Sequence, residues 1–218
     1  AAIVLHSLTK FIGGHGTSIG GIVVDGGNFD WIKNRKRQPL LNEPDQSYGG
    51  AVWTDAVPVL TGANIPFVIR LRVVLLRDTG APLAPFNAWQ IIQGLETVGL
   101  RMKQHCANAE KVVTFLETQK KVKNVIYPTN HQGEIKERAK KYLQGGNGAL
   151  VGADLGTAEA GAKFIDNLKM LYHVANIGDA RSLAIHPATT THSQLSEKEL
   201  LAAGVTPGYV RLSIGIEH

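Results

Sequence analysis

The sequence predicts an α/β fold with a smaller α+β unit toward its C-terminal end. Three observations support this prediction: β-branched runs alternate with helical patterns, one long helical pattern crosses the middle of the chain, and short strands and helices follow residue 128. The chain has 218 residues, which suits one large domain or two small ones. Its 44% hydrophobic and 19% charged content is typical of a globular protein.

The first 85 residues are predicted to contain two strands, a long loop and a helix. Residues 3–5 and 19–25 are β-branched runs on either side of a glycine-rich segment. Residues 34–50 are rich in charge, proline and glycine, and we expect a loop there. A helix is predicted from Pro66 to Asp78, closed by Gly80.

A long helix is predicted from Phe86 to about Lys121, because apolar residues recur there at spacings of mostly three or four. Gly94 and Gly99 are positions where this helix can bend. Since a helix of this length often connects two modules, we expect three parts: residues 1–85, the helix 86–125, and a C-terminal α+β part 126–218.

The C-terminal part is predicted to alternate between helices and strands. Helices are expected at 135–143 and 159–171, and strands at 149–154, 173–177, 182–185 and 209–214. Ser196, with Glu199 three residues later, is a typical capped helix start.

Composition disfavours several classes of function. The net charge of +5 is modest, and its densest cluster, residues 33–37, has no aromatic platform or recognition motif, so we expect no nucleic-acid binding. No apolar run approaches the roughly 20 residues of a membrane span. The histidines form no HExxH motif and no cysteine pairs accompany them, so we expect no metal site. The only cysteine, Cys106, is expected to be a packed residue. A single cysteine cannot form an internal disulfide, which fits a reducing cytoplasm.

The stretch HSLTKFIGGHGTSIGG, from His6 to Gly21, places a lysine between hydroxyl residues and glycines. It is not a P-loop, because the lysine precedes the glycines, and a third glycine is missing from the dinucleotide fingerprint. In an extended segment Ser7 and Thr9 point to the same side and can converge on one anion, with Lys10 directly after them. A phosphate held by two hydroxyls beside an amine is the chemistry expected for a phosphorylated aldehyde such as pyridoxal phosphate. A surface lysine in an ordinary turn is the alternative.

These residues resemble the pyridoxal-phosphate-dependent enzymes of cysteine and methionine metabolism, whose lysine segment is similar to residues 7–15 here. The resemblance covers nearly the whole chain, and within the family it is closest to sulfhydrylases that act on O-acetylhomoserine. Further segments that carry it are Pro85–Trp89, Gly94–Thr97, Leu100–Met102, Asn176–Pro187 and Val210–Glu217.

The resemblance implies fold type I of the pyridoxal-phosphate-dependent transferases (aspartate-aminotransferase-like). Residues 1–85 would then be the C-terminal part of the cofactor domain, 86–125 the inter-domain helix, and 126–218 the C-terminal α+β domain. Lys10 would hold the cofactor as a Schiff base and shuttle protons, while Ser7 and Thr9 would donate to its phosphate. Arg211 and Ser182 would bind the substrate α-carboxylate.

The resemblance also implies the reaction: γ-replacement on O-acetyl-L-homoserine by sulfide or methanethiol, giving homocysteine or methionine and acetate. Arg181 favours a small sulfur nucleophile, because a cation repels the distal amino group of cystathionine. Cystathionine γ-synthase and methionine γ-lyase activities stay open as alternatives, as does an inactive fragment. The family implies a homotetramer built from dimers, small-molecule substrates and a cytoplasmic location. We expect the chain to be the C-terminal portion of a longer enzyme, with an aspartate and a ring-stacking aromatic supplied from upstream of Ala1.

Overall fold

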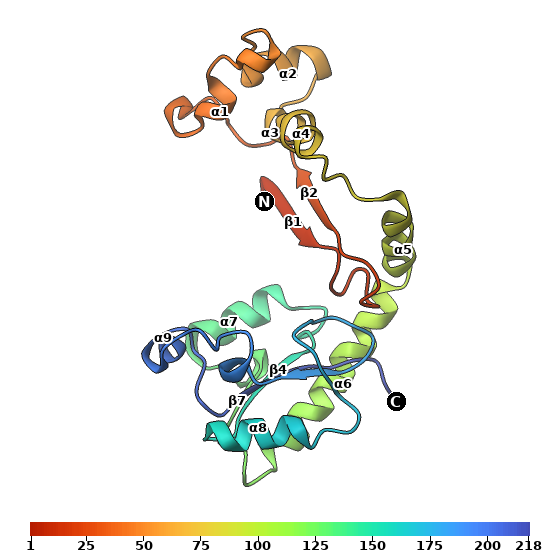
Figure 1. The fold of residues 1–218 in the computed structure, drawn as a ribbon, viewed down its shortest axis with the longest axis vertical. Helices are drawn as coiled ribbons and strands as arrows, with labels where there is room; N and C mark the ends of the chain where they lie inside the picture. The colour runs from red at the N-terminus through yellow and green to blue at the C-terminus, as the bar shows by residue number, and fades with distance from the viewer. The chain divides into compact units, whose positions relative to one another are not determined.

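The computed structural model describes residues 1–218, which divide into two compact units. The first unit comprises Ala1–Leu8 and Ile19–Ala88, and the second comprises Thr9–Ser18 and Trp89–His218. The mixture of strands and helices predicted from the sequence is confirmed within both units (Figure 1). The three-part domain division stays a prediction.

The first unit combines a two-stranded antiparallel sheet with short helices. The strands are β1 (Ile3–Ser7) and β2 (Gly21–Asp25), paired so that Leu5 lies opposite Val23. The helices are α1 (Pro39–Asn42), α2 (Trp53–Thr61), α3 (Pro66–Arg70) and α4 (Arg77–Thr79), and a π-helical stretch from Leu71 to Leu76 joins the last two. A small core forms around Trp31, Leu41, Trp53 and Val57.

Most elements predicted for this region are confirmed, and two helices, α1 and α2, were not predicted. The helical stretch from residue 66 ends at Gly80, whose φ of 64° is the left-handed value of a helix C-cap. Helix α2 was missed because Pro58 lies inside it. The helix tolerates this proline within its nine residues and ends at Gly62, whose N–H donates to the Pro58 carbonyl at 2.9 Å. The predicted loop 34–50 contains α1 and two single 3₁₀ turns.

The second unit is built on a five-stranded sheet in the order β3-β4-β7-β6-β5. All neighbouring strands are antiparallel except β5 and β6, which run parallel. The strands are β3 (Asn124–Ile126), β4 (Leu150–Asp154), β5 (Tyr172–His173), β6 (Leu183–Ile185) and β7 (Tyr209–Ser213).

The core of this unit lies between the sheet and two helices, α6 (Val98–Glu117) and α8 (Ala158–Asp166). Val151 and Ala153 of β4 pair with Leu212 and Val210 of β7, and all four are buried in this core. Because successive side chains of a strand point to opposite faces, Arg211 leaves β7 on the face away from these helices.

The single long helix predicted from residue 86 is wrong: the structure has α5 (Pro85–Glu96) and α6, interrupted at Thr97. Thr97 has φ −106° and ψ 2°, outside the helical region, and its hydroxyl donates to the Gly94 carbonyl at 3.3 Å. A threonine side chain bonded to the local backbone competes with helical hydrogen bonding, and glycines on both sides lower helix propensity further.

The strand predicted at 173–177 is wrong beyond His173: β5 covers only Tyr172–His173, because the chain then turns through Gly178, whose φ of 75° is left-handed. Strand β3 was not predicted, and the other elements are present with slightly shifted bounds. Helix α7 (Gly133–Tyr142) and helix α9 (Glu197–Ala202) are present, and Ser196 and Glu199 form the predicted capping box. Helix α8 ends at Asp166 rather than residue 171, since the Asn167 side chain caps the Lys163 carbonyl at 2.7 Å. No single helix is long and apolar enough to cross a membrane, although the bent pair α2 with residues 66–79 passes by length and composition.

Candidate active site

Lys10 lies at the start of a tight turn in the segment Thr9–Ser18, hereafter the lysine loop. The Gly14 N–H donates to the Lys10 carbonyl at 2.8 Å, and Gly14 itself has a left-handed φ of 72°. The Lys10 side chain is half-buried, and its Nζ donates a short hydrogen bond to Oδ1 of Asn176. The lysine is therefore held at a defined place in the second unit, unlike a freely solvated surface lysine.

Asn176 belongs to the loop of residues 174–182, which connects β5 to β6 and is hereafter the Asn176 loop. This loop is joined to the lysine loop by a bond from the Ala180 N–H to the Gly14 carbonyl at 2.8 Å. It is joined to β7 by a bond from the Gly178 N–H to the Ser213 hydroxyl at 2.9 Å. A Cβ at Gly178 would lie 2.6 Å from the Phe11 nitrogen, so the close approach of the two loops requires glycine there.

Arg211 of β7 reaches the same place from the sheet. Its Nη2 donates to the carbonyls of Ala175 at 3.0 Å and Asn176 at 3.2 Å. Its Nε is buried without a partner, and burial lowers the pKa of the guanidinium. An unpartnered buried N–H of a cation is costly, and an anionic group that accepted from it would remove that cost.

Lys10, Asn176 and Arg211 together form a small cationic site. The lysine bonds the amide side chain of Asn176 and the arginine bonds its backbone, so one residue connects the two cations. Neither cation forms an ion pair with a carboxylate. The arrangement can therefore accept an anion such as an amino-acid carboxylate beside a primary amine.

Ser182 is not brought into this cluster. Its side chain is only 3% exposed, donates to Glu217 at 2.9 Å and accepts from the Gly215 N–H at 2.8 Å. These bonds attach the end of the Asn176 loop to the chain after β7. Its predicted contact with a substrate carboxylate stays a prediction, while the bonds observed here are structural.

The two predicted phosphate donors fall in different units. Ser7 is the last residue of β1, is exposed, and pairs with Gly21. Thr9 is half-buried at the start of the lysine loop in the second unit. Their role as phosphate donors stays a prediction.

Arg181 does not act as a free cation. Its Nε and Nη2 donate to both carboxylate oxygens of Asp179, at 3.1 and 2.9 Å, and its guanidinium lies over the Tyr172 ring. Burial acts to raise the pKa of Asp179, but the hydrogen bonds from Arg181 outweigh it, and the pKa lies below its ordinary value. Much of the arginine charge is therefore neutralised within the Asn176 loop, which weakens the repulsion inferred from the sequence.

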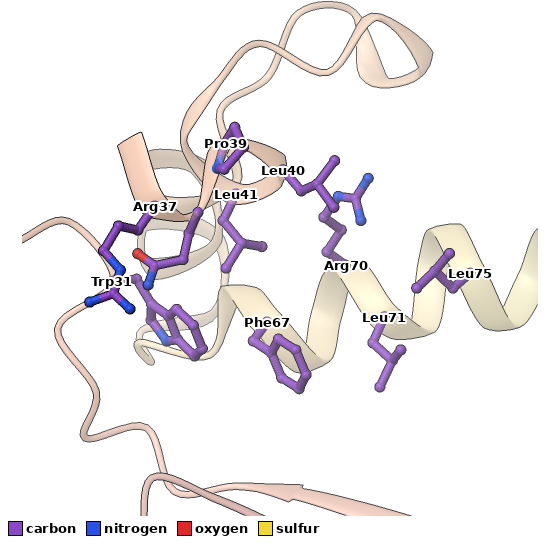
Figure 2. A pocket seen from close by; sticks show the side chains of 10 residues that line it. Trp31, Arg37, Pro39, Leu40, Leu41, Phe67, Arg70, Leu71 and Leu75 are labelled. Carbon is purple, nitrogen blue, oxygen red and sulfur yellow. The ribbon is translucent and has the colours of Figure 1, made fainter. Parts of the chain in front are cut away.

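The first unit contains a separate apolar pocket of about 370 Å³ (Figure 2). Figure 2 shows Trp31, Leu41 and Phe67 among its lining side chains, and the Trp31 and Phe67 rings stack with centroids 5.6 Å apart. Arg37 and Arg70 are the only charged residues in the lining. The pocket holds no lysine or histidine and lacks the groups that the predicted chemistry requires.

All 218 residues match one protein family, described as Cys/Met metabolism PLP-dependent enzyme. The chain belongs to this family. It is 50% identical over 223 residues to O-acetyl-L-homoserine sulfhydrylase of Leptospira meyeri, covering 100% of this chain and 50% of that protein. It is 41% identical over 228 residues to homocysteine/cysteine synthase of Saccharomyces cerevisiae, again covering 100% and 50%.

A solved structure of a putative O-acetylhomoserine (thiol)-lyase from Campylobacter jejuni agrees with the fold of this family member at a TM-score of 0.89 and 40% identity. The alignment covers 100% of this chain and 51% of that one, and that crystal structure contains an N'-pyridoxyl-lysine-5'-monophosphate residue. The predicted fold class is thereby confirmed. The chain spans about half the length of the relatives that it matches.

Sequence reasoning missed two residues of this site, Asn176 and Arg101. Both lie in segments that carry the family resemblance, but no role was assigned to either, and the Gly178 turn two residues after Asn176 is the further local signal there. Arg101 bonds the carbonyls of Phe11 and Ile12 in the lysine loop, at 2.8 and 3.0 Å. The sequence feature that could have identified Arg101 is a charged residue among the apolar positions of a predicted helix.

Gly94 permits the lysine loop to approach α5, and we expect Gly94→Ala to displace the loop. A Cβ there would lie 2.3 Å from the Gly13 carbonyl oxygen and 2.7 Å from that of Ile12. The expected cost is roughly 1–3 kcal/mol in the free energy of unfolding, measured by denaturant titration of the full-length native protein. Gly99→Ala is the matched control, because nothing lies within 4 Å of its Cβ. The same small stabilisation in both variants would contradict the close approach.

Asp179 makes stability depend on pH in a direction that can be tested. Its pKa is lowered in the folded state, so its contribution is complete above the unfolded-state pKa of about 3.9 and is lost as pH falls through the lower folded value. Asp179→Asn should therefore lower the melting temperature at neutral pH, and the deficit should fade as the pH falls below about 4. Melting curves from about pH 3 to 7 would check this, with the exposed Asp166→Asn as control. A deficit that grows toward acid would refute the assignment.

Proposed function

We propose that the protein carrying this chain is a pyridoxal-phosphate-dependent transferase that replaces the acetoxy group of O-acetyl-L-homoserine by sulfide or methanethiol. The observation that carries the proposal is the convergence of Lys10 and Arg211 on Asn176, with no carboxylate paired to either cation. The names of the relatives, O-acetyl-L-homoserine sulfhydrylase and homocysteine/cysteine synthase, support the choice of substrate.

The residues present fit the cofactor. Lys10 offers a primary amine held by a neutral amide, and Thr9 lies directly before it. Arg211 offers a buried Nε without a partner, which suits the carboxylate of an amino-acid substrate. Pyridoxal phosphate, when bound, supplies an electron sink for negative charge that develops beside the amino carbon of the substrate.

In the proposed reaction Arg211 binds and orients the substrate through its α-carboxylate. Two backbone carbonyls of the Asn176 loop fix its Nη2, so the guanidinium has a set direction before substrate arrives. Such pre-organisation lowers the entropic cost of holding the substrate in a reactive geometry. Asn176 holds the Lys10 amine beside the same carboxylate site.

Lys10 is the proposed acid and base. Its amine would accept the proton from the substrate Cα and transfer protons at Cβ, as a general base and acid. In the overall balance the Cγ–O bond breaks and acetate leaves with its electron pair, while a Cγ–S bond forms and the thiol proton is released. The product is homocysteine with sulfide and methionine with methanethiol.

The remaining parts of the proposal rest on the family alone. Attachment of the cofactor to Lys10 through a Schiff base, assembly into a homotetramer and a cytoplasmic location belong to this proposal. The single buried cysteine, Cys106, is compatible with a reducing compartment.

Covalent capture of the cofactor tests the role of Lys10. The full-length native protein incubated with pyridoxal phosphate and then borohydride should gain one phosphopyridoxyl group, located by peptide mapping on Lys10. Lys10→Ala should gain none, whereas the exposed Lys169→Ala should behave as the parent. A folded parent that gains no group, or gains it on another lysine, would refute the proposal.

Substrate dependence tests the role of Arg211. Arg211→Lys should raise the KM for O-acetylhomoserine roughly 10- to 100-fold, because an ammonium group cannot replace the bidentate fork, while capture of the cofactor by Lys10 stays at the parent level. Steady-state assays of thiol product would measure this, with the surface variant Arg138→Lys as control. An unchanged KM would exclude Arg211 as the carboxylate-binding residue.

A further inference from the structure

Arg101 is a buried cation without an acidic partner. It lies in the first turn of α6, is 6% exposed, and forms no ion pair with a carboxylate. Burial lowers its pKa. A buried charge persists in a protein when its hydrogen bonds are satisfied, so the acceptors around this guanidinium indicate what it does.

Those acceptors are backbone carbonyls and one hydroxyl. Nη1 donates to the Phe11 carbonyl at 2.8 Å, and Nη2 donates to the carbonyls of Ile12 at 3.0 Å and Gly94 at 2.7 Å. Nε donates to the Thr97 hydroxyl at 3.2 Å. The planar fork thus joins the lysine loop to the point where α5 ends and α6 begins.

The carbonyls that Arg101 binds are those that directly follow Lys10. Lys10 starts a single helical turn that ends at Gly14, and the carbonyls at the end of such a turn have no partner within it. The guanidinium supplies the missing donors for Phe11 and Ile12. A Cβ at Gly14 would lie 2.1 Å from Nη1 of Arg101, and the left-handed φ of 72° at this position favours glycine independently.

A second residue of α6 holds the side chain next to the lysine. His105, one turn after Arg101, is fully buried and packs edge-on against the Phe11 ring at 5.3 Å between centroids. Its Nδ1 donates to the Ile214 carbonyl at 2.7 Å in the tautomer that this acceptor requires. Burial lowers the pKa of His105 and the Arg101 charge lowers it further, against the opposing effect of the hydrogen bond to the Ile214 carbonyl.

We propose that Arg101 is a positioning residue: by binding the carbonyls of Phe11 and Ile12 it fixes the turn that aims the Lys10 amine at Asn176. The proposal rests on the proposed function, because it assigns a purpose to the orientation of Lys10 as the cofactor-binding amine. Arg101 does not touch the amine and acts only through the backbone. Lysine cannot replace it, since one ammonium group does not match acceptors spread across a planar fork.

Hydrogen exchange of the lysine loop tests this without any activity assay. In the full-length native protein without added cofactor, Arg101→Lys should speed amide exchange in peptides covering residues 9–18 by about 10-fold or more, while β4 and β7 stay protected. Lys103→Met is the control, because Lys103 is exposed on the same helix. Thr97→Val removes the acceptor that orients Nε together with the bond from the Thr97 hydroxyl to the Gly94 carbonyl, while all Nη bonds of Arg101 remain, and we expect a smaller change in the same direction.

Capture of pyridoxal phosphate provides the second readout. Arg101→Lys should slow borohydride-trapped labelling of Lys10 by about 10-fold. In Arg101→Ala, added guanidinium ions should restore much of the lost rate, whereas the same concentration of methylammonium should not, because only guanidinium reproduces the fork.

The outcomes separate this proposal from the proposed function. If the parent is not labelled at Lys10, the proposed function fails, whatever the exchange data show. If the parent is labelled, and folded Arg101→Lys and Thr97→Val both match it in exchange and labelling rate, the positioning role is overturned. If Arg101→Lys does not fold, Thr97→Val is the deciding variant. Faster amide exchange in its lysine loop than in the parent supports the proposal, and an unchanged exchange rate refutes it.

Discussion

The candidate site depends on one close contact, in which the backbone of the lysine loop lies directly against the end of α5. Gly94 has no side chain, and any Cβ there would collide with the carbonyls of Ile12 and Gly13. The approach leaves carbonyls facing protein instead of water, which is costly unless donors reach them. Arg101 provides those donors from the next helix, and Thr97 both interrupts the helix and accepts from the arginine. The bonds of Arg101 therefore connect the break between α5 and α6 to the backbone that follows Lys10.

The same logic operates on the other side of the lysine loop. The Asn176 loop approaches Phe11 through Gly178, is bonded to Gly14 through Ala180, and is fixed to β7 through Ser213. Arg211 projects from β7, whose neighbours Val210 and Leu212 are buried in the core of the second unit. A site built between rigid elements holds its geometry better than one carried on free loops.

Local patterns were sufficient to predict several parts of this arrangement. The glycine-rich turn around Lys10 and the strand that carries Arg211 each depend on a short contiguous stretch of sequence, and the structure contains both. The hydrogen bond between Lys10 and Asn176 joins residues 166 positions apart in the sequence, and neither periodicity nor motif spacing can predict such a contact. The prediction of one continuous helix from residue 86 was wrong for a related reason. The apolar spacing continues across Thr97, but the Thr97 hydroxyl bonds the Gly94 carbonyl and accepts from the buried Arg101, and the helix is interrupted there. Ser182 was assigned by resemblance, and its bonds to Glu217 and Gly215 depend on packing that the sequence does not display.

The chemical type of residue 176 is itself explained by the site. An aspartate there would form ion pairs with Lys10 and lie beside Arg211, and a nearby negative charge favours the protonated form of an amine. Such a carboxylate would also occupy the place of an incoming anion. The amide of Asn176 accepts the hydrogen bond from Lys10 without adding charge, so it fixes the amine and leaves the positive character of the site intact. A neutral acceptor between two cations is what a site for an anionic amino-acid substrate requires, and it links the orientation of the amine to the recognition of the carboxylate.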